Sequence, residues 1–275
     1  MPLLSIIIPC YNSGQFLPEA VESVSAYPDR SVYEIIIVDD GSTDQNTLDF
    51  LAQLPRKEYT VIHQENKGPA AARNTGIRAA KSDYILFLDS DNKIRSAYID
   101  RGIELLNNRP DVGVVHGNAA FFGAKNKVQF VPSEFSLLKI LHSNYIDMCS
   151  VVRKSVWEAV GGLDENRSII GHEDWEFWIR IGESGWKFAH IDEVLFDYRI
   201  REDSLTTQVG AEDKISKMLS YVYGKHWKLF MRYFKYLDKQ LEYYKEDQNS
   251  PVRSFFKYLY NKYIVRRDSE TNEFI

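Results

Sequence analysis

Cysteine and long apolar segments are both scarce in this chain of 275 residues. Its two cysteines, Cys10 and Cys149, lie far apart and show no metal-binding spacing, so we expect two reduced thiols in a protein core. No apolar run reaches about 18 residues, so no transmembrane helix is predicted. The N-terminus lacks a basic segment followed by a long apolar one, so no signal peptide is predicted. These absences predict a cytoplasmic protein.

A strong charge of either sign is also missing. The sequence has 34 Lys and Arg against 39 Asp and Glu, a formal net charge of −5, which argues against nucleic acid as a partner. The charge is uneven, because residues 225–267 contain eleven basic and four acidic residues, together with twelve aromatic ones. We therefore predict an α/β domain over residues 1–224 and a basic, aromatic-rich helical extension over residues 225–275, with the boundary near Gly224.

Strand-like and helix-like patterns alternate along the first part of the chain. Short apolar runs predict strands over residues 4–8, 34–38, 60–63, 84–88 and 112–116. Amphipathic patterns predict helices over residues 16–24, 47–54, 69–80 and 96–108. Further along we expect a hairpin over residues 117–131 and helices over residues 151–160 and 172–183. Such alternation is typical of an α/β fold with a mainly parallel sheet covered by helices on both faces.

Polar residues follow three of the predicted strands. Ligands of such sheets bind outside the carboxyl ends of the strands, where neighbouring strands deliver side chains to one edge. The residues in question are Pro9, Tyr11 and Asn12, then Asp39 and Asp40, and then Asp89, Ser90 and Asp91. We expect these three groups to line one binding site.

The segment Asp89-Ser90-Asp91 places two carboxylates one residue apart, directly after an apolar strand. Two such acids repel each other. A divalent cation that prefers oxygen ligands, Mn²⁺ or Mg²⁺, relieves this repulsion and often bridges to phosphate oxygens. By itself the pattern also fits a solvated surface turn, but its position at the end of a buried strand favours the cation site.

Two further segments suit a nucleotide. Asp39 or Asp40 can accept a hydrogen bond from a pyrimidine N3–H or a ribose hydroxyl, although residues 42–43 equally predict a helix N-cap. Arg73 lies one turn into a helix that begins after Gly68, where it can reach a base carbonyl or a phosphate. The alternative is an ordinary alanine-rich packing helix with one surface arginine.

Glu173 and Asp174 open the predicted helix over residues 172–183. The helix dipole stabilises acidic residues in a first turn, which explains the pair without any catalysis. A carboxylate held there is also a suitable general base for a hydroxyl group. Because successive helix residues diverge by about 100°, the two acids have different surroundings, and periodicity alone does not select the base.

Taken together, these segments resemble glycosyltransferase family 2, inverting enzymes of the GT-A fold, from Ser5 to about Leu205. The resemblance implies that Asp91 binds the cation and that Asp174, beside Glu173, is the catalytic base. Many relatives carry histidine where this chain has Arg201, which can instead pair with the diphosphate. The donor-binding residues that the resemblance implies are Pro9, Tyr11, Asn12, Asp39, Asp40, Arg73, Asp89, Ser90 and Arg201.

The predicted function is an inverting transfer of a hexosyl or N-acetylhexosaminyl group from a nucleotide-diphosphate sugar, with UDP favoured over dTDP. The predicted acceptor is a hydroxyl of a glycan or a lipid-linked saccharide, as in polysaccharide biosynthesis. A non-catalytic sugar-nucleotide-binding or scaffold protein is the alternative. A nucleotidyltransferase is disfavoured, because no glycine-rich phosphate loop follows the first strand.

Two segments have less specific expectations. Residues 162–171 are bounded by glycines and mostly polar, so we expect this loop to become ordered over a bound donor. The basic and aromatic residues 225–267 suit peripheral contact with an anionic membrane surface, such as the inner face of the plasma membrane, where lipid-linked acceptors reside. They equally suit a helical appendage that packs on the catalytic domain or on another subunit.

Overall fold

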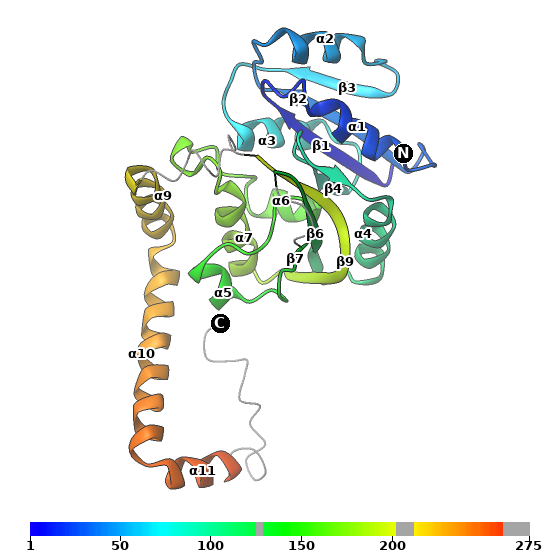
Figure 1. The fold of residues 1–275 in the computed structure, drawn as a ribbon. Helices are drawn as coiled ribbons and strands as arrows, with labels where there is room; N and C mark the ends of the chain where they lie inside the picture. The colour runs from blue at the N-terminus through cyan, green and yellow to red at the C-terminus, as the bar shows by residue number, and fades with distance from the viewer. Residues whose placement is uncertain (125–128, 202–211, 261–275) are drawn as a thin grey trace. The chain divides into compact units, whose positions relative to one another are not determined.

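The computed structural model describes residues 1–124, 129–201 and 212–260. The chain divides into two compact units, Met1–Met218 and Leu219–Ile275, and each is described by itself. The division lies within helix α9 (Glu212–Lys225), the helix that also contains the predicted boundary near Gly224. The first unit is built around a single sheet with helices packed against it (Figure 1).

Within the described residues, nine strands form this sheet in the order β3-β2-β1-β4-β8-β6-β9-β5, and β7 pairs with β6. Strands β1 to β4 pair in parallel, as do β6 and β9, whereas β8 runs antiparallel to β4 and β6, and β5 antiparallel to β9. This mixed sheet confirms the predicted fold class. The strands are β1 Leu4–Cys10, β2 Tyr33–Asp39, β3 Tyr59–His63, β4 Tyr84–Phe87, β5 Lys93–Ile94, β6 Val112–Gly123, β7 Gln129–Phe130, β8 Val151–Arg153 and β9 Lys187–Ile200.

Helices cover both faces of the sheet. Ile6 of β1 packs in one core cluster with apolar residues of α1 and α4, whereas Ile7 on the opposite face meets Gly76 of α3. A β-carbon at Gly76 would lie 2.5 Å from Ile7 Cγ2, so only glycine permits this close approach. On the same face as α3, Phe177 of α7 contacts Phe87 edge to face. The helices of this unit include α1 Leu17–Ser25, α2 Gln45–Gln53, α3 Pro69–Ala79, α4 Ser96–Asn108, α5 Leu137–His142, α6 Lys154–Ala159 and α7 Glu173–Glu183.

The register brings the predicted strand ends together. Cys10 of β1 pairs with Asp39 of β2, and Ile7 of β1 pairs with Phe87 of β4. The Leu88 N–H donates to the Ile7 carbonyl (3.0 Å), so the chain leaves β4 close to the end of β1. The polar residues after β1, β2 and β4 therefore emerge at one edge of the sheet, as parallel strands require.

The predicted helix over residues 151–160 is wrong in its first part. Val151–Arg153 form β8, and α6 begins only at Lys154. Val151 is fully buried between Leu86 of β4 and Val115 of β6, with which it pairs. Valine fits a pleated, buried surface well, so pairing on both sides overrides the helical pattern. The hairpin over residues 117–131 is confirmed by the antiparallel pairing of β6 with β7.

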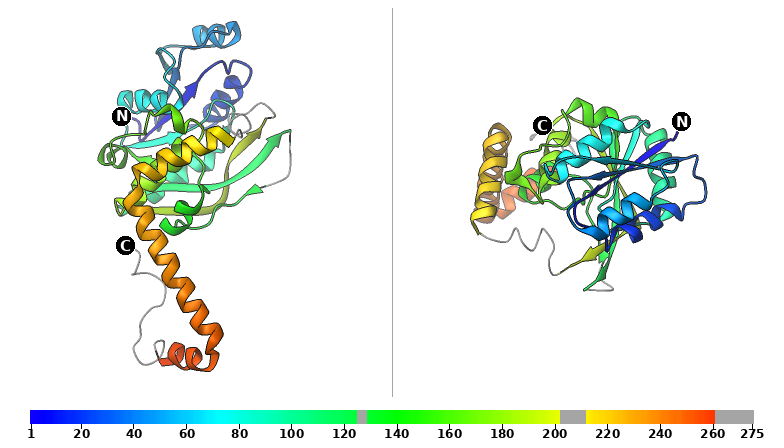
Figure 2. Two further views of the ribbon diagram at one scale, coloured as in Figure 1. Left: turned by 90° about the vertical axis from the view of Figure 1, so that its left-hand side faces the viewer. Right: turned by 90° about the horizontal axis from the view of Figure 1, so that it is seen from above.

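Cys10 and Cys149 are free and buried, which confirms the prediction of core thiols. The second unit contains α10 (Trp227–Asn249), a long continuous helix, followed by the shorter α11 (Pro251–Leu259) (Figure 2). Among the described residues, no helix combines the length and apolar character needed to cross a bilayer. Residues 261–267 of the predicted basic segment lie outside the described residues.

Candidate active site

The loop after β1 is tied to the loop after β2. Asn12 has a left-handed backbone conformation (φ 50°), which asparagine tolerates better than most residues. Its N–H donates to Ser42 Oγ (2.9 Å), and its Oδ1 accepts from the Thr43 N–H (2.8 Å). Pro9 is buried within β1, whereas Tyr11 is 50% exposed. Tyr11 and Asn12 are therefore the members of this predicted group that a ligand can reach.

Asp39 is buried at the end of β2. Its Oδ1 accepts from the Ser42 N–H (2.9 Å), and its Oδ2 lies 2.9 Å from Nδ1 of the exposed His63. The predicted N-cap at residues 42–43 is wrong, because Asp44 caps α2 by accepting from the Thr47 N–H (3.0 Å). The donor contact of Asp39 stays a prediction.

Asp40 fastens the segment that leads into α3. Its Oδ1 accepts from the side chain of Gln64 (2.7 Å) and the N–H of Lys67 (2.9 Å), and its Oδ2 accepts from the N–H of Gly68 (2.8 Å). Gly68 has a φ of 94°, a conformation that favours glycine. Both oxygens of Asp40 are engaged within the protein, so it positions the start of α3. Its direct donor contact stays a prediction.

Arg73 of α3 lies at the centre of the site and is only 4% exposed, so the alternative of a surface arginine is wrong. Its Nη2 donates to Asp89 Oδ1 (2.5 Å), and its Nη1 donates to Glu173 Oε1 (2.6 Å). Burial alone would lower the pKa of Arg73, but the two carboxylates outweigh burial and raise it. Arg73 thus joins α3, the end of β4 and the start of α7 through a buried ion network.

Asp91 and Ser90 follow Asp89 in a turn, and all three side chains are half-buried. Asp91 Oδ2 lies 3.3 Å from Nη1 of Arg201, beyond the end of β9. Burial and the negative charge of Asp89 raise the pKa of Asp91, and Arg201 only partly opposes this shift. Arg201 therefore meets the acids after β4, and the carboxylate of Asp91 is incompletely neutralised.

Glu173 and Asp174 are neighbours with different environments. Glu173 is buried, with one oxygen on Arg73 and the other accepting from the Gly171 N–H (2.7 Å). Asp174 is half-buried, and it accepts from its neighbour Trp175 N–H (2.7 Å) and from Asn144 Nδ2 (2.7 Å). Burial, followed by the charges of Glu173 and Asp147, raises the pKa of Asp174 to about 8. Glu173 is thus neutralised by the buried guanidinium of Arg73, whereas Asp174 has no such ion pair within the part of the chain that the structure describes.

Asn144 and Asp147 belong to the site but were missed by sequence reasoning. They lie in the irregular segment between α5 and β8, where no strand end or helix start draws attention to them. Burial, followed by the charge of Asp89, raises the pKa of Asp147 to about 7. A search for polar residues at strand ends cannot find such residues, because only the packing of this segment brings them to the site.

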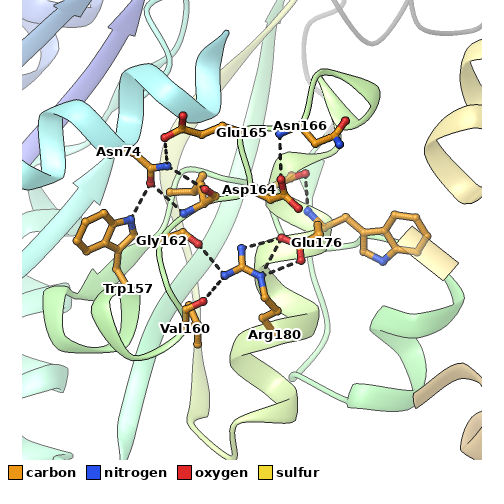
Figure 3. Close-up of polar contacts among 12 residues, drawn as sticks. Asn74, Trp157, Val160, Gly162, Asp164, Glu165, Asn166, Glu176 and Arg180 are labelled. Atoms are coloured by element: carbon orange, nitrogen blue, oxygen red, sulfur yellow. Dashed lines mark hydrogen bonds and ion pairs between the residues drawn. The ribbon is translucent and has the colours of Figure 1, made fainter. Parts of the chain in front are cut away.

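The loop that follows α6 is held in place by two side chains (Figure 3). Asn74 of α3 donates to the Leu163 carbonyl (2.8 Å) and to Glu165 Oε1 (2.8 Å), and accepts from the Leu163 N–H (2.9 Å). Arg180 of α7 donates to the carbonyls of Val160 (2.6 Å) and Gly162 (2.7 Å). The start of the loop is therefore ordered without a donor, and donor-dependent ordering of residues 162–171 stays a prediction.

A small cleft separates this loop from the start of α3. Its walls come from the segment that Asp40 fastens, from the loop after α6 and from Glu173 at the start of α7. The N-terminal end of α3 opens into it, and such an end favours negative charge. The lining residues are Lys67, Gly68, Pro69, Ala70, Asp164, Glu165, Asn166, Ile170 and Glu173.

TarS and PcManGT are among the solved structures that resemble the fold. TarS 1–349 of S. aureus, in complex with UDP-GlcNAc, has a TM-score of 0.63 at 20% identity, over 82% of this chain and 73% of that chain. The mannosyltransferase PcManGT of Pyrobaculum calidifontis, in complex with GDP-Man and Mn²⁺, has a TM-score of 0.61 at 17% identity, over 82% of this chain and 64% of that chain. These likenesses confirm the predicted GT-A fold.

Sequence comparison gives the family. An uncharacterized glycosyltransferase of Haemophilus influenzae is 32% identical over 190 residues, which cover 65% of this chain and 71% of that protein. The sequence profile described as "Glycosyl transferase family 2" matches residues 5–160, which contain the strand ends and Arg73 of the site above. The protein is a glycosyltransferase, and it belongs to glycosyl transferase family 2.

Proposed function

We propose that this glycosyltransferase inverts the anomeric configuration and that Asp174 is its general base. The observation that supports this most is the state of Asp174, which forms no ion pair with a basic side chain among the described residues and whose pKa burial raises to about 8 although Arg73 opposes the shift. A base works best when its pKa lies near the working pH, because it is then both available and strong enough to take a proton. Glu173 is less suitable, since Arg73 and the Gly171 N–H engage its two oxygens.

The residues after β4 fit a divalent cation, Mn²⁺ or Mg²⁺. Asp91 is the proposed ligand and Asp89 the proposed ribose contact, because Asp91 carries an incompletely neutralised charge while Asp89 pairs with Arg73. No three His, Cys, Asp or Glu side chains converge as a metal cage in the described part of the chain, and these cations typically complete their coordination with phosphate oxygens and water. When bound, the cation offsets charge on the diphosphate leaving group.

The proposed donor is a UDP-sugar carrying a hexosyl or N-acetylhexosaminyl group. TarS binds UDP-GlcNAc, and PcManGT binds GDP-Man with Mn²⁺, so proteins of this fold accept different bases. In this chain Tyr11, Asn12 and Asp39 are the proposed nucleotide contacts. Arg201, beside Asp91, is the proposed diphosphate contact, since guanidinium groups pair well with phosphate oxygens.

In the proposed reaction, the acceptor is a hydroxyl of a glycan or a lipid-linked saccharide, as in polysaccharide biosynthesis. Asp174 takes the proton of this hydroxyl while the hydroxyl oxygen attacks the anomeric carbon from the side opposite the diphosphate. The bond between that carbon and the diphosphate oxygen breaks, and the nucleoside diphosphate leaves with the bonding electrons. Asn144 holds the orientation of Asp174 through its hydrogen bond to Oδ2. Arg73 pairs with Asp89 and with Glu173. It thereby fixes the acids after β4, which bind the donor in this proposal, relative to the start of α7, where the acceptor binds.

A thermal-shift experiment tests the donor site. UDP, dTDP and GDP are each added with and without Mn²⁺ to the wild type, to Asp91→Ala and to Asp100→Asn, a control at an exposed position on α4. We expect UDP to stabilise the wild type only with Mn²⁺, by about 2.7 kcal/mol at about 100 times its Kd. Asp91→Ala should lose this effect and Asp100→Asn should keep it. Equal shifts with and without Mn²⁺ would contradict the proposed cation site.

The second unit supports a proposed contact with an anionic membrane surface, at the inner face of the plasma membrane. Apolar side chains of α10 that are 42–61% exposed recur at three- and four-residue spacing, which places them on one stripe of the helix. They are Trp227, Met231, Phe234, Leu237, Leu241 and Tyr244. Four exposed basic residues with the same spacing form a neighbouring stripe, and these are Lys228, Arg232, Lys235 and Lys239. An apolar and a basic stripe side by side are typical of a helix that lies at a membrane surface.

Sedimentation with vesicles tests this contact. We expect the full chain to sediment with vesicles that contain anionic lipid, and the charge-reversed variant Lys228→Glu/Lys235→Glu to bind them at least several-fold more weakly. Binding to purely neutral vesicles should be weak for both proteins, because the basic stripe then has no partner. Absence of sedimentation at low salt, together with a concentration-dependent increase in molecular mass, would instead indicate self-association through α10.

A further inference from the structure

The segment between α5 and β8 is clamped between the two halves of the catalytic site. At one end, the Ser150 carbonyl accepts a hydrogen bond from the N–H of Phe87 in β4 (3.2 Å). Phe87 lies two residues before Asp89 in the chain. At the other end, Asn144 donates to Asp174 (2.7 Å), and Trp178 Nε1 of α7 donates to the Ile146 carbonyl (3.0 Å). Asp147 lies between these two attachments in the chain, so the clamped segment holds it near both the acids after β4 and the proposed base.

The carboxyl group of Asp147 is fixed by one oxygen. Its Oδ1 accepts from the Cys149 N–H (2.8 Å), and its own carbonyl accepts from Ser150 Oγ (2.9 Å). Tyr98 OH further holds this turn by donating to the Cys149 carbonyl (2.7 Å). Within the described residues the other oxygen, Oδ2, has no hydrogen-bond donor, although the side chain is half-buried. The turn thus holds a carboxylate with one oxygen that no hydrogen bond from the described residues engages.

The electrostatics agree with this position. After burial, Asp89 is the largest influence that raises the pKa of Asp147, and Asp147 is in turn one of the charges that raise the pKa of Asp174. Asp147 therefore interacts electrostatically with Asp89 at one end of the site and with Asp174 at the other. In an inverting transfer, the sugar ring lies between the diphosphate that leaves and the hydroxyl that attacks. A group close to both ends faces the sugar itself.

We propose that Asp147 is a specificity-determining residue whose Oδ2 accepts a hydrogen bond from a hydroxyl group of the donor sugar. This inference rests on the proposed function, because it requires the diphosphate near Asp91 and the acceptor near Asp174. A carboxylate that is fixed in orientation and partly removed from water makes a stronger hydrogen bond than a neutral acceptor. A sugar that lacks this hydroxyl, or that carries it in the other configuration, leaves the carboxylate without a partner and is rejected.

Calorimetric titration separates the sugar contact from the nucleotide contact. UDP, UDP-glucose, UDP-galactose, UDP-GlcNAc and UDP-GalNAc are titrated with Mn²⁺ into the wild type, Asp147→Ala, Asp147→Asn and the exposed control Asp100→Asn. Asp147→Asn keeps an oxygen for the Cys149 N–H and so preserves the turn. For the sugar nucleotide that the wild type binds best, we expect Asp147→Ala to weaken binding by about 10- to 100-fold, the usual worth of a hydrogen bond to a charged group. The Kd of UDP should change less than about twofold, and Asp100→Asn should match the wild type.

A deoxy donor strengthens the test. Removing the contacted hydroxyl from that sugar nucleotide should weaken binding to the wild type by a similar factor and leave binding to Asp147→Ala unchanged, since the two changes remove the same interaction. If Asp147→Ala weakens UDP and the UDP-sugar equally, Asp147 acts on the cation or nucleotide and the proposal is overturned. If it weakens neither, the carboxylate does not meet the sugar. Failure of the wild type to bind UDP with Mn²⁺ would overturn the proposed donor site itself.

Discussion

Two sets of carboxylates lie at the same edge of the sheet and differ in how their charge is balanced. Glu173 and Asp89 share the buried guanidinium of Arg73. Asp174 and Asp147 are half-buried, and among the described residues they receive hydrogen bonds from neutral donors alone. Their pKa values are raised to about 8 and 7. This difference indicates that the acids paired with Arg73 hold the site together, whereas Asp174 and Asp147 keep the capacity to bind a proton or a ligand.

The largest expected effect comes from removing the carboxylate of Asp174, the proposed base. Asp174→Asn should lower the turnover number for transfer by about 10²–10⁴-fold, because the acceptor hydroxyl loses its proton acceptor. The affinity for UDP with Mn²⁺ should stay within about twofold of the wild type, since Asp174 does not contact the nucleotide in the proposed site. Initial rates of transfer and calorimetric titration measure the two quantities. Near-normal turnover of this variant would show that another group is the base.

Removing the positive charge of Arg73, which neutralises Glu173 and Asp89, should chiefly lower the free energy of unfolding. Arg73→Ala leaves Glu173 and Asp89 buried or half-buried without their partner, and breaking such a pair typically costs about 3–5 kcal/mol. Chemical denaturation should show a correspondingly lower free energy of unfolding. Arg78→Ala on the same helix is a matched control, because Arg78 is exposed and its ion pair with Glu165 is long, at 3.5 Å, so its loss should cost well under about 1 kcal/mol. Equal effects of the two variants would contradict the buried network.

The last expected effect is a pH dependence, which has opposite signs for the free energy of unfolding and for the transfer rate. The folded-state pKa values of Asp147 and Asp174 lie above the ordinary value of about 3.9, so folding takes up protons at these groups. Their contribution to the free energy of unfolding is fully present below about pH 4 and is lost as the pH rises through 7 to 8. The transfer rate should instead rise over the same upper range, as Asp174 becomes ionised.

Denaturation without metal, compared between wild type and Asp174→Asn, measures the stability part of this prediction. The variant should show a smaller fall in stability between pH 4 and 8, because one of the two groups no longer titrates. Transfer rates of the wild type between pH 6 and 9 measure the other part. A transfer rate that does not increase between pH 6 and 8 would contradict Asp174 as a base with the raised pKa.

Sequence patterns pointed to most of the acids at this edge of the sheet, but not to Asp147. Glu173, Asp174, Asp89 and Asp91 could be proposed from the sequence because strand ends and helix starts are local signals. Asp147 was missed, since its segment has no regular element, and the start of β8 at Val151 was mistaken for helix. Pairing with β4 and β6 on either side of β8 decided that outcome, and neither partner is near it in sequence.

Local sequence patterns were sufficient to predict the α/β class, the strand-end position of the polar groups and the opening of α7 by two acids, because each depends on residues within a few positions of one another. They did not determine which of those two acids is neutralised. That was decided by Arg73, which lies 100 residues from Glu173 in the chain and reaches its carboxylate but not that of Asp174. The balance of charge at a site depends on distances through space, and only the tertiary structure fixes those distances.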